Sequence, residues 1–224
     1  MNETVSIEDK AVNKISIREL SYLFIKRLFD ILISIIGLII LIPFAIIIKI
    51  AYMCTGDFSS IVFRQQRIGK NGKLFKFYKF RSMVPNADEI LFRTLELDEI
   101  MAEEYKKNKK LKNDPRITKI GKVIRKLSID ELPQFINIFL GDMSLIGNRP
   151  YLPREKEDMG DYYEEILKTK PGLTGYWQVN GRSNTSFEDR LKLESYYSNH
   201  MSLILDIKIF LKTFKVVIFG KDAK

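Results

Sequence analysis

The chain has 224 residues, and 37 Lys and Arg against 28 Asp and Glu give it a net charge of +9 at neutral pH. Such a charge favours an anionic partner: nucleic acid, acidic lipid head groups or a phosphorylated substrate. Cys54 is the only cysteine, which excludes an intramolecular disulfide, and the only histidine, His200, argues against a His/Cys metal cluster or a Ser-His-Asp triad. We interpret both residues as structural.

The first twenty residues are rich in Glu, Asp, Lys, Asn and Ser. They have neither the short basic start nor the small-residue cleavage site of a secretory signal. We therefore predict a polar N-terminal tail over residues 1–21 that is not removed.

An uncharged apolar run extends from Ile31 to Ile48 and contains Pro43. As a helix, its 18 residues reach roughly 27 Å, barely the hydrocarbon thickness of a bilayer. Pro43 removes a helical N–H and crowds the carbonyl of Ile39, which leaves a polar group unpaired where lipid cannot solvate it. A helix that bends and re-enters at Pro43 is therefore an alternative to a straight span.

Basic residues flank both ends of this run. They are Lys14, Arg18, Lys26 and Arg27 before it and Lys49, Arg64, Arg67 and Lys70 after it. The positive-inside rule then predicts that both ends are cytoplasmic, which favours a segment that enters the membrane and returns. A buried core helix of a soluble protein is a third alternative, weakened because Ser34 alone interrupts the apolar run.

About 170 residues follow, enough for one domain, and we treat residues 55–224 as a single unit. Ile61–Arg67 and Lys73–Arg81 flank the turn signal Lys70-Asn71-Gly72 and predict a β-hairpin. The second of these segments, KLFKFYKFR, interleaves bases with aromatics. It fits either a nucleic-acid surface or a half-buried strand, and we favour the strand.

Two later segments have helical charge patterns. Residues 88–112 are acidic first and basic afterwards, which fits a solvated helix followed by a flexible excursion. Leu203–Phe219 predicts a helix with Lys208, Lys212 and Lys215 on one face and apolar residues elsewhere. Such a helix fits a membrane surface, or a core position from which the lysines reach solvent.

The segment RKLSIDELP, residues 125–133, places Asp130 and Glu131 side by side at the predicted start of a helix. Ser128 and Glu131 have the spacing of a capping box, so helix capping is one explanation. A cap needs only one carboxylate, and several bases lie nearby, as an anionic substrate would require. These bases are Lys119, Lys122, Arg125 and Lys126.

Six segments, in one order, resemble the bacterial monotopic phosphoglycosyl transferases over nearly everything after residue 22. They are KRLFD with the apolar run, YKFRSM (78–83), DPRITKIGKVIRKLSIDELPQ (114–134), GDMSLIGNRP (141–150), KPGLTGYWQVNGR (170–182) and DIKIFLKT (206–213). The resemblance implies an enzyme that moves a sugar 1-phosphate from a UDP-sugar to a polyprenyl phosphate, such as undecaprenyl phosphate. The reaction would take place at the cytoplasmic face of the inner membrane.

Such a reaction starts the assembly of a capsule, exopolysaccharide, O-antigen or glycoprotein glycan. The implied partners are therefore the two substrates, membrane lipid and downstream glycosyltransferases, and not nucleic acid. The motifs do not specify the sugar, for which we expect a hexose 1-phosphate.

The resemblance also implies the site. Asp130 and Glu131 would form a catalytic dyad that binds Mg²⁺, with Asp130 as the nucleophile that forms a covalent aspartyl-phosphosugar and releases UMP. The implied substrate-binding residues are Lys79, Arg81, Arg125, Arg149, Pro150 and Arg182. Their cations would offset the charge of two phosphorylated substrates. Gly147, Gly175 and Gly181 would let the nucleotide approach the backbone closely.

These patterns predict an α+β fold: a helix-rich, membrane-associated catalytic domain with a small β-hairpin and an N-terminal re-entrant membrane helix over residues 22–54, broken near Pro43. Two residues depart from the family pattern, Ile42 before Pro43 and Asn148 within the Gly-Pro-Arg-Pro motif. The second predicts a less rigid loop around Arg149. The alternatives are a membrane-anchored basic protein that binds anionic lipid or nucleic acid without catalysis, and a signal-anchored domain outside the cytoplasm.

Overall fold

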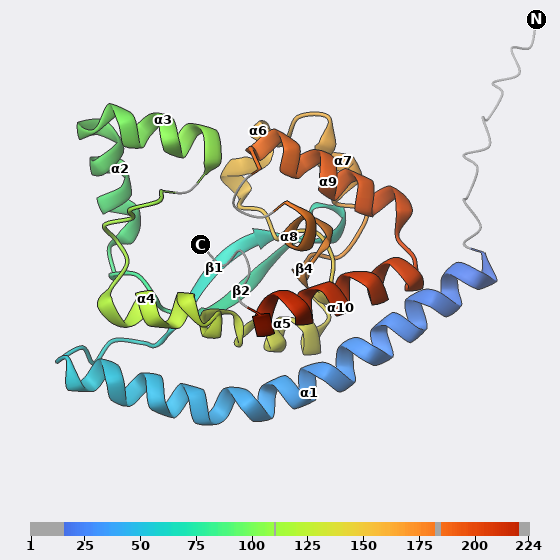
Figure 1. Cartoon of the computed structure of the whole chain (residues 1–224), viewed down its shortest axis with the longest axis horizontal. Coiled ribbons are helices and arrows are strands. Elements are labelled where there is room, and N and C mark those ends of the chain that lie inside the picture. Colours follow the sequence, from blue (N-terminus) through green and yellow to red (C-terminus); the bar gives the residue numbers. More distant parts are fainter. Residues whose placement is uncertain (1–15, 110, 182–184, 220–224) are drawn as a thin grey trace, which may run out of the picture.

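The structure, a computed structural model, describes residues 16–109, 111–181 and 185–219 (Figure 1). Helix α1, Ile17–Cys54, is its longest element and follows one side of the molecule as a curved rod. Pro43 lies inside this helix, and the structure differs here from the predicted break because α1 continues through it. A proline removes one helical hydrogen bond and imposes a φ that a helix already has, so a bend suffices.

Most of the apolar surface of α1 faces away from the rest of the chain. By length and composition the helix is able to cross a membrane, and only 17% of its most apolar 18-residue window is buried. A core helix of a soluble protein buries its apolar residues, so this low burial argues against the core-helix alternative.

Polar contacts fasten both ends of α1 to the same domain. Near the N-terminal end, Lys26 Nζ lies 2.5 Å from Asp206 Oδ2 on helix α10, Leu203–Phe219. Near the C-terminal end, the Tyr52 hydroxyl donates a hydrogen bond of 2.6 Å to the carbonyl of Arg81. The two ends of α1 are therefore held on one side of the domain.

The middle of α1 packs closely on helix α5, Gln134–Leu140. A Cβ added at Gly37 would lie 2.4 Å from the ring of Phe135, so this approach requires glycine. Nearby, the buried carboxylate of Asp30 accepts a hydrogen bond of 2.7 Å from the Leu145 amide. The buried carboxylate of α1 thus has a partner in the domain, as burial demands.

The predicted hairpin is confirmed. Strands β1, Val62–Ile68, and β2, Leu74–Phe80, pair antiparallel around a short turn, η1, Lys70–Gly72. Asn71 has a φ of 56° and tolerates this left-handed conformation better than most residues do.

The aromatic side chains of KLFKFYKFR belong to the core. Phe75, Phe77 and Phe80 are all buried, while Lys76 is exposed. The half-buried strand is therefore the correct interpretation, because these three rings are not free to stack on bases.

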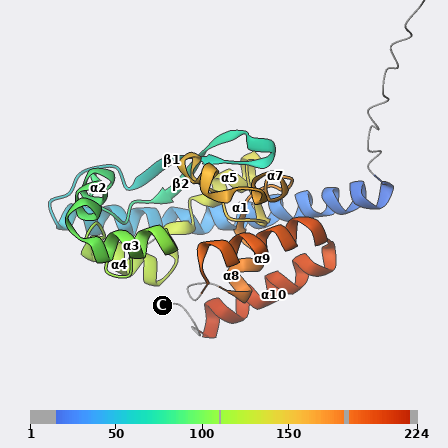
Figure 2. The same cartoon turned by 90° about the horizontal axis from the view of Figure 1, so that it is seen from above.

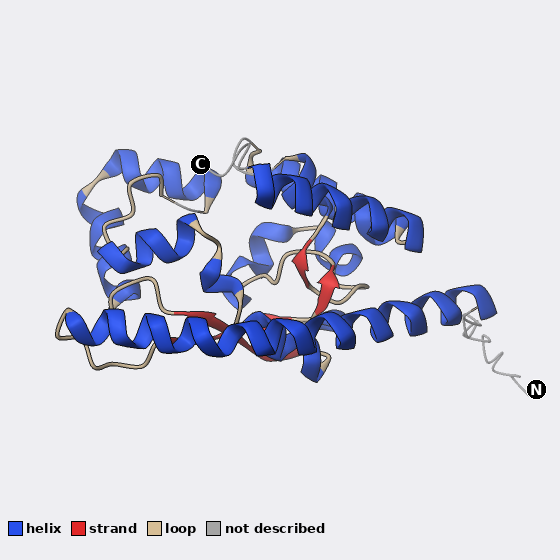
Figure 3. Cartoon of the chain, turned by 60° about the horizontal axis from the view of Figure 1, so that its bottom comes forward, coloured by secondary structure: helices blue, strands red, loops and turns tan. Residues whose placement is uncertain are grey.

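A second sheet was not predicted from the sequence. Strands β3, Ser144–Ile146, and β4, Gly172–Thr174, pair in parallel, and Figure 3 shows them separate from the hairpin. Three residues are too few to show an alternating pattern, so these strands leave no clear signal in the sequence.

The remaining elements are short helices. They are α2 (Ala87–Leu97), α3 (Glu99–Asn108), α4 (Lys119–Lys126), η2 (Ile129–Glu131), η3 (Pro153–Glu155), α6 (Lys156–Met159), α7 (Tyr162–Ile166), α8 (Tyr176–Asn180) and α9 (Phe187–His200). Helices α2 to α4 gather at one end of the molecule and α8 to α10 towards the other (Figure 2). Residues 88–112 thus contain two helices, not the single helix and excursion expected, and α3 continues through the basic Lys106 and Lys107.

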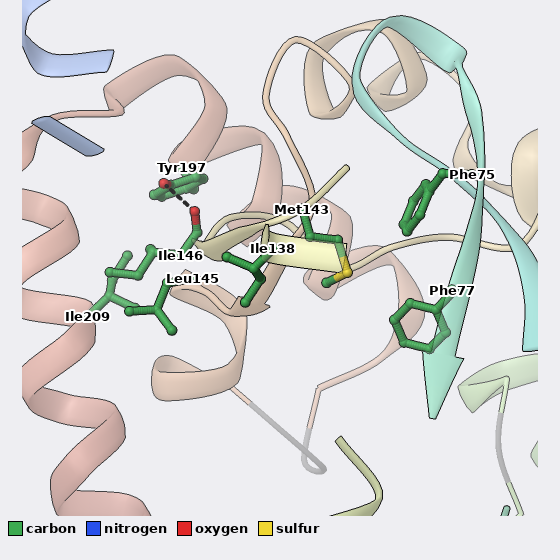
Figure 4. Close-up of a cluster of buried hydrophobic side chains, with 8 residues drawn as sticks. All are labelled: Phe75, Phe77, Ile138, Met143, Leu145, Ile146, Tyr197 and Ile209. Atoms are coloured by element: carbon green, nitrogen blue, oxygen red, sulfur yellow. Dashed lines mark hydrogen bonds between the residues drawn. The ribbon is translucent and has the colours of Figure 1, made fainter. Parts of the chain in front are cut away.

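One core cluster joins the elements that surround the candidate site. It consists of Phe75, Phe77, Ile138, Met143, Leu145, Ile146, Tyr197 and Ile209 (Figure 4). These residues come from β2, α5, β3, α9 and α10, apart from Met143, which lies between α5 and β3, so the hairpin, the parallel strands and the C-terminal helices pack on one another. The Tyr197 hydroxyl lies 3.4 Å from the Ile146 carbonyl oxygen across this cluster.

Candidate active site

The predicted dyad lies beside a lysine from the hairpin. Lys79 Nζ on β2 is 3.4 Å from Asp130 Oδ2 and 3.3 Å from Glu131 Oε1, both in η2. The side chain of Asp130 is 10% exposed, whereas that of Glu131 is 42% exposed. One ammonium thus offsets the charge of two adjacent carboxylates, of which Asp130 is the more shielded from water.

The capping-box interpretation of the dyad is wrong. Ser128 has a left-handed backbone, with φ of 56°, and its side chain makes no cap hydrogen bond. The side chain of Glu131 contacts Lys79 instead of turning back to the backbone. Helix capping therefore explains neither carboxylate.

A buried asparagine links the strand that carries Lys79 to the helix that follows the dyad. Asn137 on α5 donates a hydrogen bond of 2.6 Å to the Lys76 carbonyl and accepts one of 3.1 Å from the Tyr78 amide. Because Asn137 is fully buried, these bonds satisfy the edge of β2 where water does not reach. The strand that carries Lys79 is thereby joined to the helix that follows the dyad.

Arg125 lies behind the dyad on α4. Its Nε donates a hydrogen bond of 2.8 Å to Ser82 Oγ. Burial lowers the pKa of Arg125, and the nearby carboxylate of Asp130 opposes that shift. Helix α4 packs closely against Ser82 because Gly121 has no side chain. A Cβ there would lie 1.9 Å from the Ser82 carbonyl oxygen.

Four of the predicted residues line one pocket. They are Lys79, Glu131, Arg149 and Pro150, and the pocket is completed by Arg67, Phe77, Gln134, Gly172, Leu173 and Gln178. The pocket therefore combines one carboxylate with three cationic side chains, which suits an anionic ligand.

The loop that carries Arg149 is anchored by side chains. Asn148 is buried, and its amide nitrogen donates to Ser198 Oγ at 2.7 Å and to the Ile166 carbonyl at 3.1 Å. The Arg149 amide donates to Glu194 Oε1 at 3.0 Å. The structure thus differs from the less rigid loop that Asn148 predicted.

Glu194 is a buried acid with a perturbed pKa. It is 1% exposed, and burial raises its pKa to about 7, against the opposing effects of Tyr151, the Arg149 amide and Arg190. A neutral Glu194 still accepts the hydrogen bond that fixes the Arg149 loop.

The glycines expected to admit a nucleotide are sites of close packing within the chain. A Cβ at Gly147 would lie 2.3 Å from the Lys170 carbonyl oxygen, and one at Gly175 would lie 2.0 Å from that of Gly147. A Cβ at Gly181 would lie 2.6 Å from the methyl group of Thr185. Close approach within the chain accounts for all three.

The structure does not bring Arg81 into this pocket. Its guanidinium donates to Asp57 Oδ2 and to the Ser60 carbonyl, each at 2.8 Å, and lies 4.4 Å from the Tyr52 ring centroid. These contacts tie the end of β2 to the end of α1. Arg182 lies outside the described residues.

Arg67 lines the pocket, although the sequence indicated for it only a basic flank and the end of a predicted strand. The hairpin register pairs Arg67 with Phe75 and Phe63 with Lys79. Paired residues share a face, and so do alternate residues along a strand, so Arg67 and Lys79 face the same side of the hairpin. This relationship follows from the predicted hairpin once its register is fixed.

The described residues contain no group of three or more His, Cys, Asp or Glu side chains able to hold a metal ion. The dyad offers two carboxylates that share one lysine. Mg²⁺ in phosphate-handling sites commonly takes one or two carboxylates together with substrate phosphates. The donors present therefore fit Mg²⁺ bound jointly with a phosphorylated substrate, not a preformed metal centre.

A carboxylate dyad, a cationic pocket and a long apolar helix on one domain are typical of an enzyme that handles phosphorylated substrates at a membrane. The sequence profile of the bacterial sugar transferase family matches residues 21–220, and the chain belongs to this family. The resemblance drawn from the sequence motifs is thereby confirmed.

Three curated relatives are informative. The chain is 47% identical over 195 residues to an undecaprenyl-phosphate galactose phosphotransferase of Salmonella typhimurium, covering 87% of this chain and 40% of that protein. It is 46% identical over 205 residues to the galactosyl transferase CpsE of Streptococcus agalactiae, covering 91% and 44%. It is 40% identical over 198 residues to the exopolysaccharide production protein ExoY of Sinorhizobium fredii, covering 88% and 87%. The chain thus spans less than half the length of the first two.

Proposed function

We propose that this chain transfers a hexose 1-phosphate from a UDP-sugar to undecaprenyl phosphate and releases UMP, as a first step of capsule, exopolysaccharide or related glycan synthesis. The proposal rests on the position of Asp130, whose shielded carboxylate lies beside Lys79 and next to a cationic pocket. Relatives named for undecaprenyl-phosphate galactose and glucose transfer support the substrate class.

In the first step, a carboxylate oxygen of Asp130 attacks the β-phosphorus of the UDP-sugar. The bond from that phosphorus to the bridging oxygen breaks, and UMP leaves with the bridging oxygen. The product is a covalent aspartyl-phosphosugar. Lys79, 3.4 Å from Asp130, reduces the repulsion between the carboxylate and the diphosphate, and Arg149 offers a bidentate phosphate contact.

In the second step, a phosphate oxygen of undecaprenyl phosphate attacks the same phosphorus. The bond between phosphorus and Asp130 breaks, which regenerates the carboxylate and yields a lipid diphosphate sugar. Downstream glycosyltransferases would extend this product. Two displacements at one carboxylate give ping-pong kinetics.

Asp130 and Glu131 would hold Mg²⁺ together with the substrate phosphates, and the ion would supply charge neutralisation at the leaving diphosphate. The more exposed Glu131 is the better placed of the two to share such an ion, because its side chain lines the pocket. Lys79 contacts both carboxylates and holds them beside each other.

We also propose that α1 holds the enzyme on the cytoplasmic face of the inner membrane with both ends on that side. Its two ends contact the same domain, and its outer face is apolar. Helix α10 exposes Ile204, Leu211 and Phe214 beside the exposed Lys208 and Lys212. This combination supports an interfacial helix. An acceptor with a hydrocarbon tail requires a site near this surface.

The test is UMP release by the purified full chain with undecaprenyl phosphate, Mg²⁺ and a panel of UDP-sugars. We expect release with one hexose donor and a loss on the order of 10³-fold or more in Asp130→Asn. Asp161→Asn, at an exposed position, is the matched control and should retain full activity. Full activity of Asp130→Asn would overturn the role of Asp130, and no release with any sugar would overturn the reaction.

A further inference from the structure

Arg67 on β1 is a partly buried cation in the wall of the pocket. Its guanidinium donates hydrogen bonds of 3.0 Å to the Pro150 carbonyl and 2.9 Å to Gln65 Oε1, and it lies 5.2 Å from the Phe77 ring centroid. Its Nε is inaccessible to solvent and has no hydrogen-bond partner among the described residues. Neutral groups therefore orient this guanidinium without neutralising it.

The largest charge–charge effect on the pKa of Arg67 is repulsive. Burial and, second, the charge of Arg149 lower the pKa of Arg67 to about 9, and Glu155 raises it by less than Arg149 lowers it. Within the described part of the chain, no carboxylate lies within ion-pair distance of Arg67 or Arg149. Two like charges are thus held together in one pocket.

Arg149 is constrained in the same way. Its backbone amide is fixed by Glu194, while its Nε is buried and has no partner in the described residues. Partly buried cations without an ion-pair partner are unfavourable, and an anion that accepts hydrogen bonds from both would relieve the cost. A guanidinium group binds two phosphate oxygens through two parallel N–H donors. A pair of arginines therefore offers two such bidentate contacts.

We propose that Arg67 binds substrate together with Arg149, and that the pair holds the phosphate that leaves as UMP. This inference rests on the proposed function and adds to it a residue and a subsite. Lys79 lines the same pocket, so on this proposal Lys79 serves the phosphate that Asp130 attacks and the arginine pair serves the phosphate that leaves. The leaving phosphate gains negative charge during that step, and Arg67 would stabilise it there.

The experiment compares Arg67→Gln and Arg67→Lys with wild type in the full chain, reconstituted in lipid nanodiscs. UMP is the probe for equilibrium binding, and UDP-sugar turnover gives kcat and KM. Arg64→Gln is the matched control, because Arg64 is an exposed arginine on the same strand and does not line this pocket. Thermal unfolding midpoints are recorded for every variant.

We expect Arg67→Gln to weaken UMP binding and raise KM for the UDP-sugar by about tenfold or more, as the loss of a charge-assisted bidentate contact predicts. The UMP affinity and KM of Arg67→Lys should fall between those of wild type and Arg67→Gln, because lysine keeps the charge and lacks the paired donors of the guanidinium. Arg64→Gln should match wild type.

If wild type binds UMP and turns over the sugar nucleotide while both Arg67 variants behave like Arg64→Gln, the inference is wrong and the proposed function stands. If Arg67→Gln lowers the unfolding midpoint and leaves UMP affinity and KM unchanged, the inference is also wrong. Arg67 would then have only a structural role, through its hydrogen bond to Pro150. If Arg67→Gln does not fold, Arg67→Lys decides by the same comparison. If wild type releases no UMP from any donor, the proposed function fails first.

Discussion

Lys26 Nζ lies 2.5 Å from Asp206 Oδ2, and this ion pair joins the start of the apolar helix α1 to the C-terminal helix α10 across 180 positions of sequence. The hydroxyls of Tyr22 and Tyr197 donate to the same carboxylate at 2.8 Å and 2.7 Å. Asp206 is therefore buried with three donors, and it fixes the apolar helix α1 to the end of the domain.

We predict that Lys26→Met destabilises the chain by about 3 kcal/mol, because it leaves the buried carboxylate of Asp206 without a counter-charge. The double variant Lys26→Met/Asp206→Leu should recover part of this loss, since it removes both charges. Denaturant unfolding in detergent micelles measures the effect, with Lys208→Met as an exposed control. Equal stability of Lys26→Met and the control would contradict the prediction.

Lys79→Met should lower UMP release by about 10²-fold or more, because one ammonium offsets the charge of both dyad carboxylates. Lys79→Arg should retain part of the activity. Lys76→Met is the control, since Lys76 is exposed on the same strand and its side chain points to the opposite face. Equal rates for Lys79→Met and Lys76→Met would remove Lys79 from the mechanism.

Asn137→Ala should lower the free energy of unfolding by about 2 kcal/mol, because it leaves the buried Lys76 carbonyl and Tyr78 amide without their partner. Activity should fall with it, since β2 carries Lys79. Thermal unfolding and UMP release are measured side by side with Gln66→Ala, an exposed amide on the paired strand. An unfolding midpoint within a degree of that control would show that Asn137 does not clamp the strand.

Glu194 predicts a pH dependence of stability. Its folded-state pKa of about 7 lies above its ordinary value of 4.5, so the folded chain holds this proton more tightly than the unfolded chain does. The corresponding stability, about 3 kcal/mol, is fully present below pH 4.5 and is lost as the pH rises through 7. Unfolding is followed from pH 5 to pH 8 in wild type and Glu194→Gln.

Wild type should lose stability over this window, and Glu194→Gln should lack that component because glutamine does not titrate. Tyr151, Arg149 and Arg190 face Glu194 and are unchanged between the two proteins. Parallel pH profiles would mean that Glu194 does not titrate in this range.

Periodic and charged features of the sequence predicted much of this structure. The hairpin has the expected turn, and the C-terminal helix has the expected bounds, because both rest on local patterns of turn residues and apolar spacing. The structure also places Lys79 beside Asp130 and Glu131.

Features that depend on distant contacts were missed or misread. The strands β3 and β4 are short and are paired by glycine-mediated approach, which no local pattern reports. Ser128 has the spacing of a cap but a left-handed backbone, which spacing alone does not reveal. The local sequence indicates only a flanking charge for Arg67, because its place on the same side as Lys79 depends on the hairpin register.

The most direct test of the covalent mechanism is the intact mass of the protein after incubation with its UDP-sugar and Mg²⁺ in the absence of undecaprenyl phosphate. We predict a mass increase of one phosphosugar on Asp130 together with UMP release in equal amount, absent from Asp130→Asn and discharged when undecaprenyl phosphate is added. If UMP release required the lipid acceptor and wild type carried no adduct, transfer would be direct and Asp130 would not be the nucleophile.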